Sequence, residues 1–325
     1  MERDELLDVL IIGGGPAGMA AGIYAGRSKL RTVLVEKGAT GGQISTTDIV
    51  DNYPGFPDGI TGQALSEQLE AHAKRFGTEI VSDEIESVER TAEGWLARGY
   101  DTFRARTLII SSGARERRLG VPGEDAFRGR GVSYCAVCDG AFFSDQDVVV
   151  VGGGDSAITE GLYLTRMCNS VTVVHRREEL RAAREYQDRA FRNDKMRFVW
   201  NSAVQEIGGN GKVQFVRLRD TQSGQEKTLP TSGVFVYVGM IPNTDYLKGV
   251  LSMNESGYIP TDELMRTSAP GVFACGDVRV TSLRQVATAV GDGAIAAMSA
   301  EAYLATLEHQ AKQAPVTISS EGDRL

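Results

Sequence analysis

Two cysteines separated by two residues, with an acid directly behind them, are the residues of this chain best suited to redox chemistry. The stretch is Cys135-Ala136-Val137-Cys138-Asp139-Gly140. This spacing lets the sulfurs approach closely enough to bond, and one thiolate can be stabilised by its neighbour. The alternative is half of a zinc site, which needs a second pair of ligands at similar spacing. The other cysteines and the histidines are scattered, at Cys168, Cys275, His72, His175 and His309. We therefore predict a redox pair and no metal site.

A glycine-rich loop stands on each side of this pair. The first, Gly13-Gly14-Gly15-Pro16-Ala17-Gly18, follows the apolar residues 6–12 and precedes a helix-like run and a strand that ends in Glu36. The glycines permit a tight turn and the close approach of a pyrophosphate to a helix N-terminus, and the acid can accept hydrogen bonds from ribose hydroxyls. In this setting the loop predicts a dinucleotide-binding βαβ unit.

The second loop repeats the first and ends differently. Gly152-Gly153-Gly154-Asp155-Ser156-Ala157 lies between the apolar residues 147–151 and a helix-like run, and the next strand ends in His175-Arg176-Arg177, with Arg181 one helical turn further on. Arginines hold phosphate through charge-assisted, often bidentate hydrogen bonds, whereas an acid would repel a 2′-phosphate. The repeat predicts two dinucleotides, and we expect the second to be NADPH rather than NADH.

The bulk properties limit the class of protein. With 325 residues and a prior of about 150 residues per domain, two domains are expected. No apolar run approaches the ~20 residues of a membrane span, and the charged N-terminus does not resemble a signal peptide, so we expect a cytoplasmic protein. The net charge of −8 and the pI of about 5.1 argue against nucleic acid or an anionic membrane as the main partner.

The elements that position these residues predict an α/β fold. A turn-rich stretch at 41–57, a helix at 62–76, an antiparallel stretch at 80–106 and a buried strand at 107–114 separate the first loop from a linker at 115–121. A β-rich stretch at 198–238, a strand at 271–277 and a helix at 284–304 follow the second loop. We expect two Rossmann-like domains of the three-layer ββα type, the second inserted into a discontinuous first one.

Together the motifs resemble one family. The order GGGPAG, GGQ, NYPGF, CxxCDG, GGGxSA, HRRxxxRA, PNT, GVFxxGD, RQxxxAxGDG is similar to that of the low-molecular-weight thioredoxin reductases. These are flavoproteins of the pyridine nucleotide-disulfide oxidoreductase class, and the match covers about residues 6–304. The resemblance implies an FAD-binding domain at 1–116 and 245–325, with a flexible tail at 309–325. It implies an NADPH-binding domain at 117–244 that carries the CxxC.

The resemblance also implies roles for single residues. FAD is expected to contact Gly13, Gly15, Ala17, Gly18, Glu36, Gly42, Gln43, Asn52, Gly113, Asp277, Arg284, Gln285 and Val286. NADPH is expected to contact Gly152, Gly154, Asp155, Ser156, Ala157, His175, Arg176, Arg177 and Arg181. Cys138 resembles the flavin-facing sulfur, Cys135 the sulfur that attacks the partner, and Asp139 the general acid–base. The implied partner is a thioredoxin or a thioredoxin-like protein, and the implied assembly is a homodimer.

Some points stay open at the level of sequence. Thr159 stands where the family more often has an acid, so the affinity for NADPH is uncertain. Phe142 and Phe143 are candidates either for partner docking or for the core. A dithiol oxidase and a ferredoxin-dependent reductase of the same fold are alternatives, against which the arginines weigh. A flavin-bound redox sensor without turnover is a third alternative, and the intact cysteines and Asp139 disfavour it.

Overall fold

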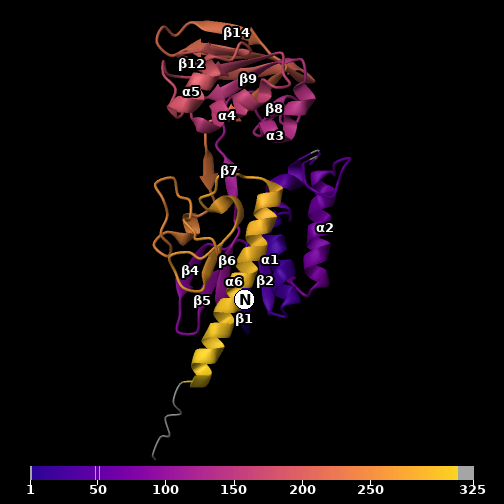
Figure 1. The fold of residues 1–325 in the computed structure, drawn as a ribbon, viewed down its shortest axis with the longest axis vertical. Helices are drawn as coiled ribbons and strands as arrows, with labels where there is room; N and C mark the ends of the chain where they lie inside the picture. Colours follow the sequence, from indigo (N-terminus) through magenta and orange to yellow (C-terminus); the bar gives the residue numbers. More distant parts are fainter. Residues whose placement is uncertain (1, 48, 51, 314–325) are drawn as a thin grey trace, which may run out of the picture. The chain divides into compact units, whose positions relative to one another are not determined.

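The chain divides into two compact units in the computed structural model, which describes residues 2–47, 49–50 and 52–313 (Figure 1). Unit 1 comprises Met1–Thr46, Ile60–Ala114 and Pro242–Leu325, and unit 2 comprises Thr47–Gly59 and Arg115–Ile241. Unit 1 is therefore discontinuous in sequence. The segment Thr47–Gly59 groups with unit 2, although it falls within residues 1–116 of the expected first domain.

The sheet of unit 1 is built around β1 (Glu2–Ile12), which pairs in parallel with β2 (Thr32–Glu36) and β6 (Thr102–Ile110). Val9, Leu10 and Ile11 are fully buried, as expected for a parallel strand that is covered on both faces. The strand order is β3–β2–β1–β6–β5–β4, and β17 pairs with β6 outside this path. The other strands are β3 (Glu79–Ser82), β4 (Ser87–Arg90), β5 (Trp95–Arg98) and β17 (Val272–Ala274).

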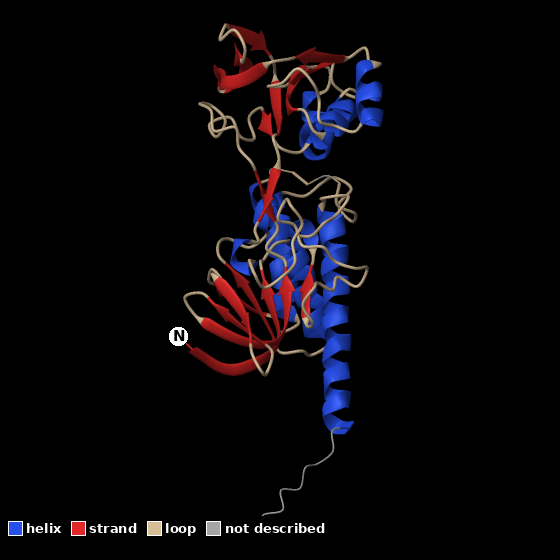
Figure 2. Ribbon diagram, turned by 90° about the vertical axis from the view of Figure 1, so that its left-hand side faces the viewer, coloured by secondary structure: helices blue, strands red, loops and turns tan. Residues whose placement is uncertain are grey.

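Helices cover this sheet, and the long helix α6 (Val286–Gln313) runs beside its strands (Figure 2). The helix α6 packs closely on α1 (Pro16–Arg27), because a Cβ on Gly293 would lie 2.1 Å from the carbonyl oxygen of Ala17. The two helices therefore meet near the first glycine loop. The other helical elements of unit 1 are α2 (Gly62–Arg75) and the short 3₁₀ helices η1 (Gly42–Thr46), η3 (Asp245–Leu247) and η4 (Gly276–Val278).

Unit 2 contains a parallel sheet in the order β11–β10–β9–β15–β8 and an antiparallel sheet in the order β12–β13–β14. The parallel strands are β8 (Val132–Ser133), β9 (Asp147–Gly152), β10 (Ser170–Val174), β11 (Met196–Val199) and β15 (Gly233–Tyr237). The antiparallel strands are β12 (Ser202–Asn210), β13 (Lys212–Asp220) and β14 (Glu226–Pro230). The helices are α3 (Ala136–Asp139), η2 (Gly140–Phe143), α4 (Asp155–Leu164) and α5 (Arg184–Phe191). Two short strands, β7 (Ala114–Glu116) and β16 (Met240–Pro242), pair where the chain passes between the units.

The predicted α/β class with two Rossmann-like parallel sheets is confirmed. Two local predictions are wrong. The stretch from residue 80 is not antiparallel throughout, since β3 pairs in parallel with β2. The last helix continues to Gln313, through residues 309–313 that were expected to be tail, and residues 314–325 lie outside the described residues. None of the described helices is long and apolar enough to cross a membrane.

Candidate functional site

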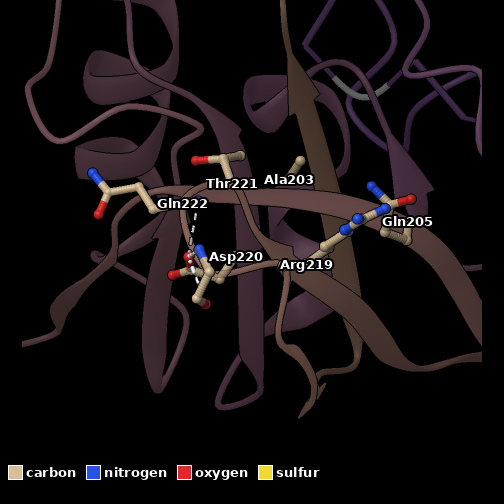
Figure 3. A pocket seen from close by; sticks show the side chains of 8 residues that line it. Ala203, Gln205, Arg219, Asp220, Thr221 and Gln222 are labelled. Carbon is tan, nitrogen blue, oxygen red and sulfur yellow. Dashed lines mark hydrogen bonds between the residues drawn. The ribbon is translucent and has the colours of Figure 1, made fainter.

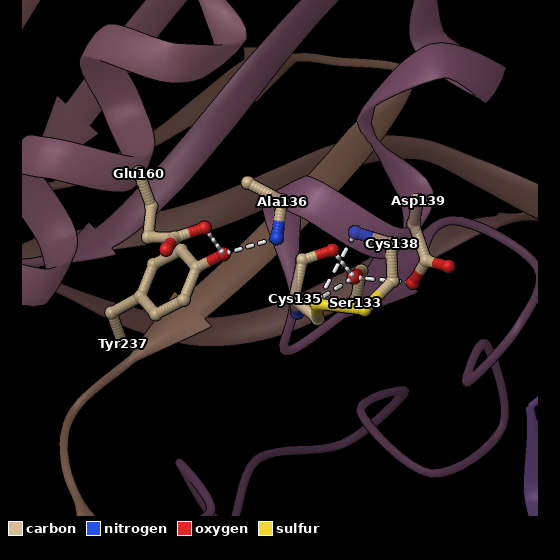
Figure 4. Close-up of a disulfide and its surroundings, with 7 residues drawn as sticks. All are labelled: Ser133, Cys135, Ala136, Cys138, Asp139, Glu160 and Tyr237. Atoms are coloured by element: carbon tan, nitrogen blue, oxygen red, sulfur yellow. Dashed lines mark hydrogen bonds between the residues drawn. A yellow bond between two sulfur atoms is a disulfide. The ribbon is translucent and has the colours of Figure 1, made fainter. Parts of the chain in front are cut away.

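Cys135 and Cys138 form a disulfide in the first turn after β8 (Figure 4). Cys135 is the N-cap of α3, and the backbone N–H of Cys138 donates to its Sγ at 3.2 Å. Ala136, between the two cysteines, is fully buried, while both cysteines are partly exposed. The short helix therefore holds the pair at the surface of unit 2, partly open to solvent.

Asp139 is held against this turn by Ser133. The hydroxyl of Ser133 donates to Oδ2 of Asp139 at 2.5 Å and accepts from the backbone N–H of Cys135 at 3.1 Å. Ser133 thus holds the Asp139 carboxylate against the turn that contains Cys135. Asp139 lies beside the sulfurs, as its place in the sequence predicts (Figure 4).

Two further side chains lie behind the cysteines. The hydroxyl of Tyr237, at the end of β15, accepts from the backbone N–H of Ala136 at 2.6 Å and donates to Oε2 of Glu160 at 3.3 Å (Figure 4). Burial, followed by the Glu160 carboxylate, raises the pKa of Tyr237 well above its ordinary value. Burial raises the pKa of Glu160, while the hydrogen bonds from Tyr237 and from two backbone amides lower it.

The second glycine loop leads from β9 into α4 in unit 2. Gly152 has φ of +152°, and a Cβ there would lie 2.4 Å from the carbonyl oxygen of Tyr237. A Cβ on Gly154, the N-cap of α4, would meet none of the described atoms outside its chain neighbours within 4 Å. Only glycine fits the first position, whereas the second faces open space at a helix N-terminus. This space is what the approach of a pyrophosphate requires.

Backbone hydrogen bonds tie the arginine segment to this loop. The N–H groups of Arg181 and Ala182 donate to the carbonyl of Gly153 at 2.7 and 3.2 Å. The N–H of Ala183 donates to Oδ1 of Asp155 at 2.7 Å. Asp155 therefore closes the loop with its carboxylate, a contact that its place in the motif did not indicate. The side chains of Arg176, Arg177 and Arg181 are exposed beside the loop.

His175 does not join the arginines at the surface. It is 5% exposed, and its ring lies under Gly153, where a Cβ would come within 2.4 Å of it. Burial, followed by the charges of Arg181, Arg177 and Arg176, lowers its pKa. We infer that the neutral His175 ring packs under Gly153 and supports the conformation of the second glycine loop. The other predicted contacts, Ser156 and Ala157, lie in the first turn of α4, where Ser156 is exposed and Ala157 is buried. The hydroxyl of Thr159 donates to the carbonyl of Asp155 at 2.9 Å.

The first glycine loop has the same construction in unit 1. Gly13 has φ of +110°, and a Cβ there would lie 2.4 Å from the carbonyl oxygen of Ser111. A Cβ on Gly18 would lie 1.9 Å from the carbonyl oxygen of Gly13, whereas one on Gly15, the N-cap of α1, would meet none of the described atoms outside its chain neighbours within 4 Å. The hydroxyl of Ser111 donates to the carbonyl of Gly13 at 2.8 Å, so this residue supports the loop. The buried Ala17 lies against Gly276.

Several predicted FAD contacts gather around this loop. Glu36, at the end of β2, accepts from the N–H groups of Gly14 and Gly38 at 2.6 and 3.0 Å. Gly42 is exposed and has φ of +59°, and the amide of Gln43 donates to the carbonyl of Ala114. Gly113 has φ of +67°. Asn52 is exposed and belongs to the segment that groups with unit 2.

The start of α6 brings Asp277, Arg284, Gln285 and Val286 to the same region of unit 1. Arg284 lies over the ring of Tyr258, 4.6 Å from its centroid, and its Nε is buried with no hydrogen-bond partner among the described residues. Burial raises the pKa of Asp277 to about 6, although the charge of Arg284 opposes this. The backbone N–H of Gln285 donates to the Thr288 hydroxyl at 3.2 Å, which caps α6 before Val286.

Other hollows carry no comparable chemistry. One lies at the turn between β13 and β14, where Asp220 accepts from the N–H groups of Gln222 and Ser223 at 3.0 and 2.7 Å (Figure 3). A second hollow, between α6 and residues 262–273, is mainly apolar.

In the described part of the chain no cluster of three or more His, Cys, Asp or Glu residues could hold a metal ion. Cys168 and Cys275 are fully buried, and burial raises their thiol pKa values, that of Cys168 to about 11.

Sequence reasoning missed Ser133, Glu160 and Tyr237. Tyr237 could have been found, because it ends a buried strand of a parallel sheet, at the edge where ligands bind. Ser133 and Glu160 carry no local signal, since each is an ordinary polar residue within its element. Phe143 packs against Phe235 with ring centroids 5.2 Å apart, while Phe142 is 57% exposed, so the two phenylalanines have different environments.

The chain is similar to oxidoreductases. The family model described as pyridine nucleotide-disulphide oxidoreductase matches residues 7–293. A thioredoxin reductase of Listeria innocua is 50% identical over 308 residues, which are 94% of this chain and 96% of that protein. One from Bacillus subtilis is 48% identical over 314 residues, 96% of this chain and 99% of that protein. The crystal structure of thioredoxin reductase from Streptococcus pyogenes is 48% identical, has a TM-score of 0.88, and covers 94% of this chain and 100% of that one.

Proposed function

Since the chain belongs to the pyridine nucleotide-disulphide oxidoreductase family, we propose that it is an FAD-containing, NADPH-dependent reductase of a disulfide in a thioredoxin or thioredoxin-like protein. The family uses a flavin and a pyridine nucleotide, and the chain is an oxidoreductase that acts on a sulfur group. The observation that carries the proposal is the Cys135–Cys138 disulfide next to Asp139, in the unit that also holds a glycine loop tied by backbone hydrogen bonds to the arginine segment.

The residues of unit 1 fit a flavin dinucleotide. The open space at Gly15 lies at the N-terminus of α1, where a pyrophosphate would meet free backbone N–H groups. Glu36 ends the next strand and keeps acceptor capacity for a ribose hydroxyl. The unpartnered Nε of Arg284 and the start of α6 offer a donor and a helix N-terminus to a flavin ring.

The residues of unit 2 fit NADPH. The open space at Gly154 takes the pyrophosphate, and the three exposed arginines beside the loop suit a 2′-phosphate. The backbone bonds from Arg181 and Ala182 to Gly153 hold the arginine segment next to the phosphates. Thr159 points its hydroxyl back into its own helix, so it places no charge near the nucleotide.

A bound flavin would supply the acceptance of a hydride from the nicotinamide and the two electrons that reduce the disulfide. We assign Cys135 as the attacking sulfur, because the N–H of Cys138 already donates to its Sγ and would stabilise a thiolate there. Cys135 attacks the partner disulfide, and the leaving sulfur of the partner takes a proton that Asp139 supplies. Cys138 then attacks Cys135, which closes the disulfide and releases the partner as a dithiol.

Three finer points extend the proposal. The family expectation of a homodimer is kept and is tested by sedimentation of the flavin-loaded protein. The cytoplasm is the compartment in which a thiol pair of this kind is kept reduced and catalytic.

The exposed ring of Phe142, four residues after Cys138, is a contact for the incoming partner, while Phe143 belongs to the core.

A coupled assay tests the function directly. Flavin-loaded protein, NADPH and an oxidised thioredoxin are mixed, and the thiols formed are read with a disulfide dye. We expect NADPH oxidation that depends on thioredoxin. Cys135→Ser and Cys138→Ser should each abolish it and still let NADPH bleach the flavin, whereas the buried Cys168→Ala should behave as wild type. Loss of flavin bleaching in either serine variant would show that the proposed order of steps is wrong.

Stopped flow with NADPH alone separates the alternatives. Fast flavin bleaching supports the reductase. Slow bleaching by NADPH with fast bleaching by a small dithiol or by reduced ferredoxin would favour the oxidase or the ferredoxin-dependent enzyme. Bleaching without any thiol product would favour a sensor. The exposed arginines beside the second glycine loop favour the first outcome.

A further inference from the structure

A chain of hydrogen bonds runs from the redox turn to two partly buried side chains of unit 2, Tyr237 and Glu160 (Figure 4). The N–H of Ala136 donates to the Tyr237 hydroxyl at 2.6 Å, and this hydroxyl donates to Glu160 at 3.3 Å. Ala136 stands between the cysteines, so the chain ends on the backbone that joins them. Neither Tyr237 nor Glu160 takes part in the thiol exchange proposed above.

The chemistry of the groups fixes the direction of this chain. The backbone N–H of Ala136 can only donate, so the Tyr237 oxygen accepts from it, and the phenol proton is donated to the Glu160 carboxylate. Burial raises the pKa of Glu160, and the donors around it, the Tyr237 hydroxyl and the N–H groups of Ala136 and Val137, lower it and so favour the carboxylate.

Rigid elements hold both residues. Tyr237 pairs with Gly152 in the register of β15 and β9, and Glu160 lies within α4, which starts at Asp155. Side chains on strands and helices keep their geometry better than side chains on loops. The second glycine loop leads from β9, the neighbour of β15, into α4, so Tyr237 and Glu160 lie on the elements that frame this loop.

We propose that Glu160 and Tyr237 are positioning residues that set the reduction potential of the Cys135–Cys138 pair. Reduction breaks the Sγ–Sγ bond with two electrons from the reduced flavin, and leaves one sulfur as a thiol with one added proton and the other as a thiolate. The Glu160 carboxylate repels this new charge, whereas the disulfide carries none. The carboxylate therefore makes the dithiol a stronger reductant, and Tyr237 couples it to the turn. This inference rests on the proposed function, since it assumes that the pair donates electrons.

The reduction potential of the pair tests the inference. Flavin-loaded full-length protein is equilibrated at pH 8 in glutathione or dithiothreitol buffers of known potential, quenched, and its thiols are counted by alkylation and mass. The thiols of Cys168 and Cys275 contribute the same number to the thiol count of every sample. Glu160→Gln keeps the shape of the side chain and removes its charge. We expect the equilibrium constant for reduction to rise by about three- to tenfold, which is a potential less negative by up to about 30 mV.

Two further variants complete the experiment. Tyr237→Phe disconnects the carboxylate from Ala136 and should shift the potential in the same direction. Glu226→Gln changes an exposed glutamate on β14 of the same unit and should leave it unchanged. Flavin content and melting temperature report on folding, and if Tyr237→Phe does not fold, Glu160→Gln decides.

The outcomes are distinct. A less negative potential in Glu160→Gln supports the inference. An unchanged or more negative potential overturns it, even if turnover falls, because a packing defect alone lowers turnover. The measurement contains neither thioredoxin nor NADPH. Failure of the proposed function would therefore leave the potential readable, and an unaltered potential would leave the proposed function standing.

Discussion

Asp139 depends for its position on a serine two residues before the first cysteine. Ser133 donates to the carboxylate and accepts from Cys135 at the same time. A general acid works only within hydrogen-bond reach of the proton that it moves. At the scale of single residues, the serine is what keeps the acid within reach of the sulfurs.

Asp139→Asn should slow turnover by about 10²–10⁴-fold, because a positioned general acid contributes a factor of this size. FAD content and NADPH binding should not change. Stopped flow should place the defect after flavin reduction, in the exchange at the cysteines. Ser133→Ala should show the same defect more weakly, since it removes the support and keeps the acid. An Asp139→Asn variant within about twofold of wild type would reduce the residue to a turn former.

The glycine loops act at the scale of elements. In each loop one glycine is required by the protein itself, Gly13 or Gly152, because a Cβ there would lie 2.4 Å from a carbonyl oxygen. The glycine at the helix N-cap, Gly15 or Gly154, faces open space and has extended backbone angles. The fold explains the first kind, and we propose that a bound cofactor explains the second.

Gly15→Ala and Gly154→Ala should therefore fold and lose different cofactors. Gly15→Ala should be purified with little flavin and still bind NADP⁺, while Gly154→Ala should be yellow and fail to bind NADP⁺. Each variant is the control of the other, and absorbance and calorimetry read the two cofactors. Normal affinity for both cofactors in both variants would contradict the assignment of the two glycine loops as cofactor-binding sites.

We propose that the arginines at the end of β10 select between the two nicotinamide nucleotides. Arg176→Ala with Arg177→Ala should erase a preference for NADPH over NADH, since each charge-assisted hydrogen bond contributes about 1.5–3 kcal/mol. The ratio of kcat/KM values measures the preference. Arg189→Ala, an exposed arginine on α5, should keep it. A wild-type protein that uses both nucleotides equally would contradict the assignment.

Glu124 joins the start of unit 2 to the redox turn. It is 3% exposed, and its carboxylate accepts from the N–H groups of Leu119 and Gly120 at 2.9 and 2.8 Å and from the Tyr134 hydroxyl at 2.7 Å. Glu124→Ala should lower the free energy of unfolding by about 2–4 kcal/mol, because it leaves buried donors unpaired. Tyr134→Phe should cost about 1 kcal/mol. Urea unfolding measures the loss of unfolding free energy in both variants. A loss below about 0.5 kcal/mol for Glu124→Ala is the level of an ordinary surface change, and it would contradict the structural role of Glu124.

At the scale of the whole molecule, each unit has its own apolar core. Leu10, Leu108 and Ile110 belong to the core of unit 1, and Val150 and Phe235 to one of the cores of unit 2. The strands β7 and β16 lie at two of the places where the chain passes between the units, after Ala114 and after Ile241. Each unit therefore contains a complete glycine loop with the strands that support it.

Hydrogen exchange should resolve the two cofactor sites. NADP⁺ should slow exchange at residues 152–157 and 176–183 and leave residues 13–18 unaffected, because bound ligands stabilise the local structure that holds them. The protection should vanish in Gly154→Ala. Protection at residues 13–18 would place the nucleotide in the wrong unit.

The sequence by itself determined the elements that local patterns encode. Apolar runs predicted the parallel strands, glycine spacing predicted both loops, and the CxxC predicted the disulfide, all of which the structure confirms. The arginines after β10 were found because the end of a parallel strand is a fixed place in a βαβ unit. These features depend on residues that are close in sequence, so a single chain shows them.

Only the tertiary structure decided what lies behind the cysteines. Ala136 and Tyr237 are 101 residues apart, and Tyr237 and Glu160 are 77 apart. The tertiary structure also shows that His175 is buried under Gly153 and that Asp155 closes the second glycine loop. It shows that Phe143 packs in the core while Phe142 is exposed. Each of these outcomes depends on how strands and helices pack. The free energy of such contacts comes from neighbours brought together by the fold, and no local pattern records them.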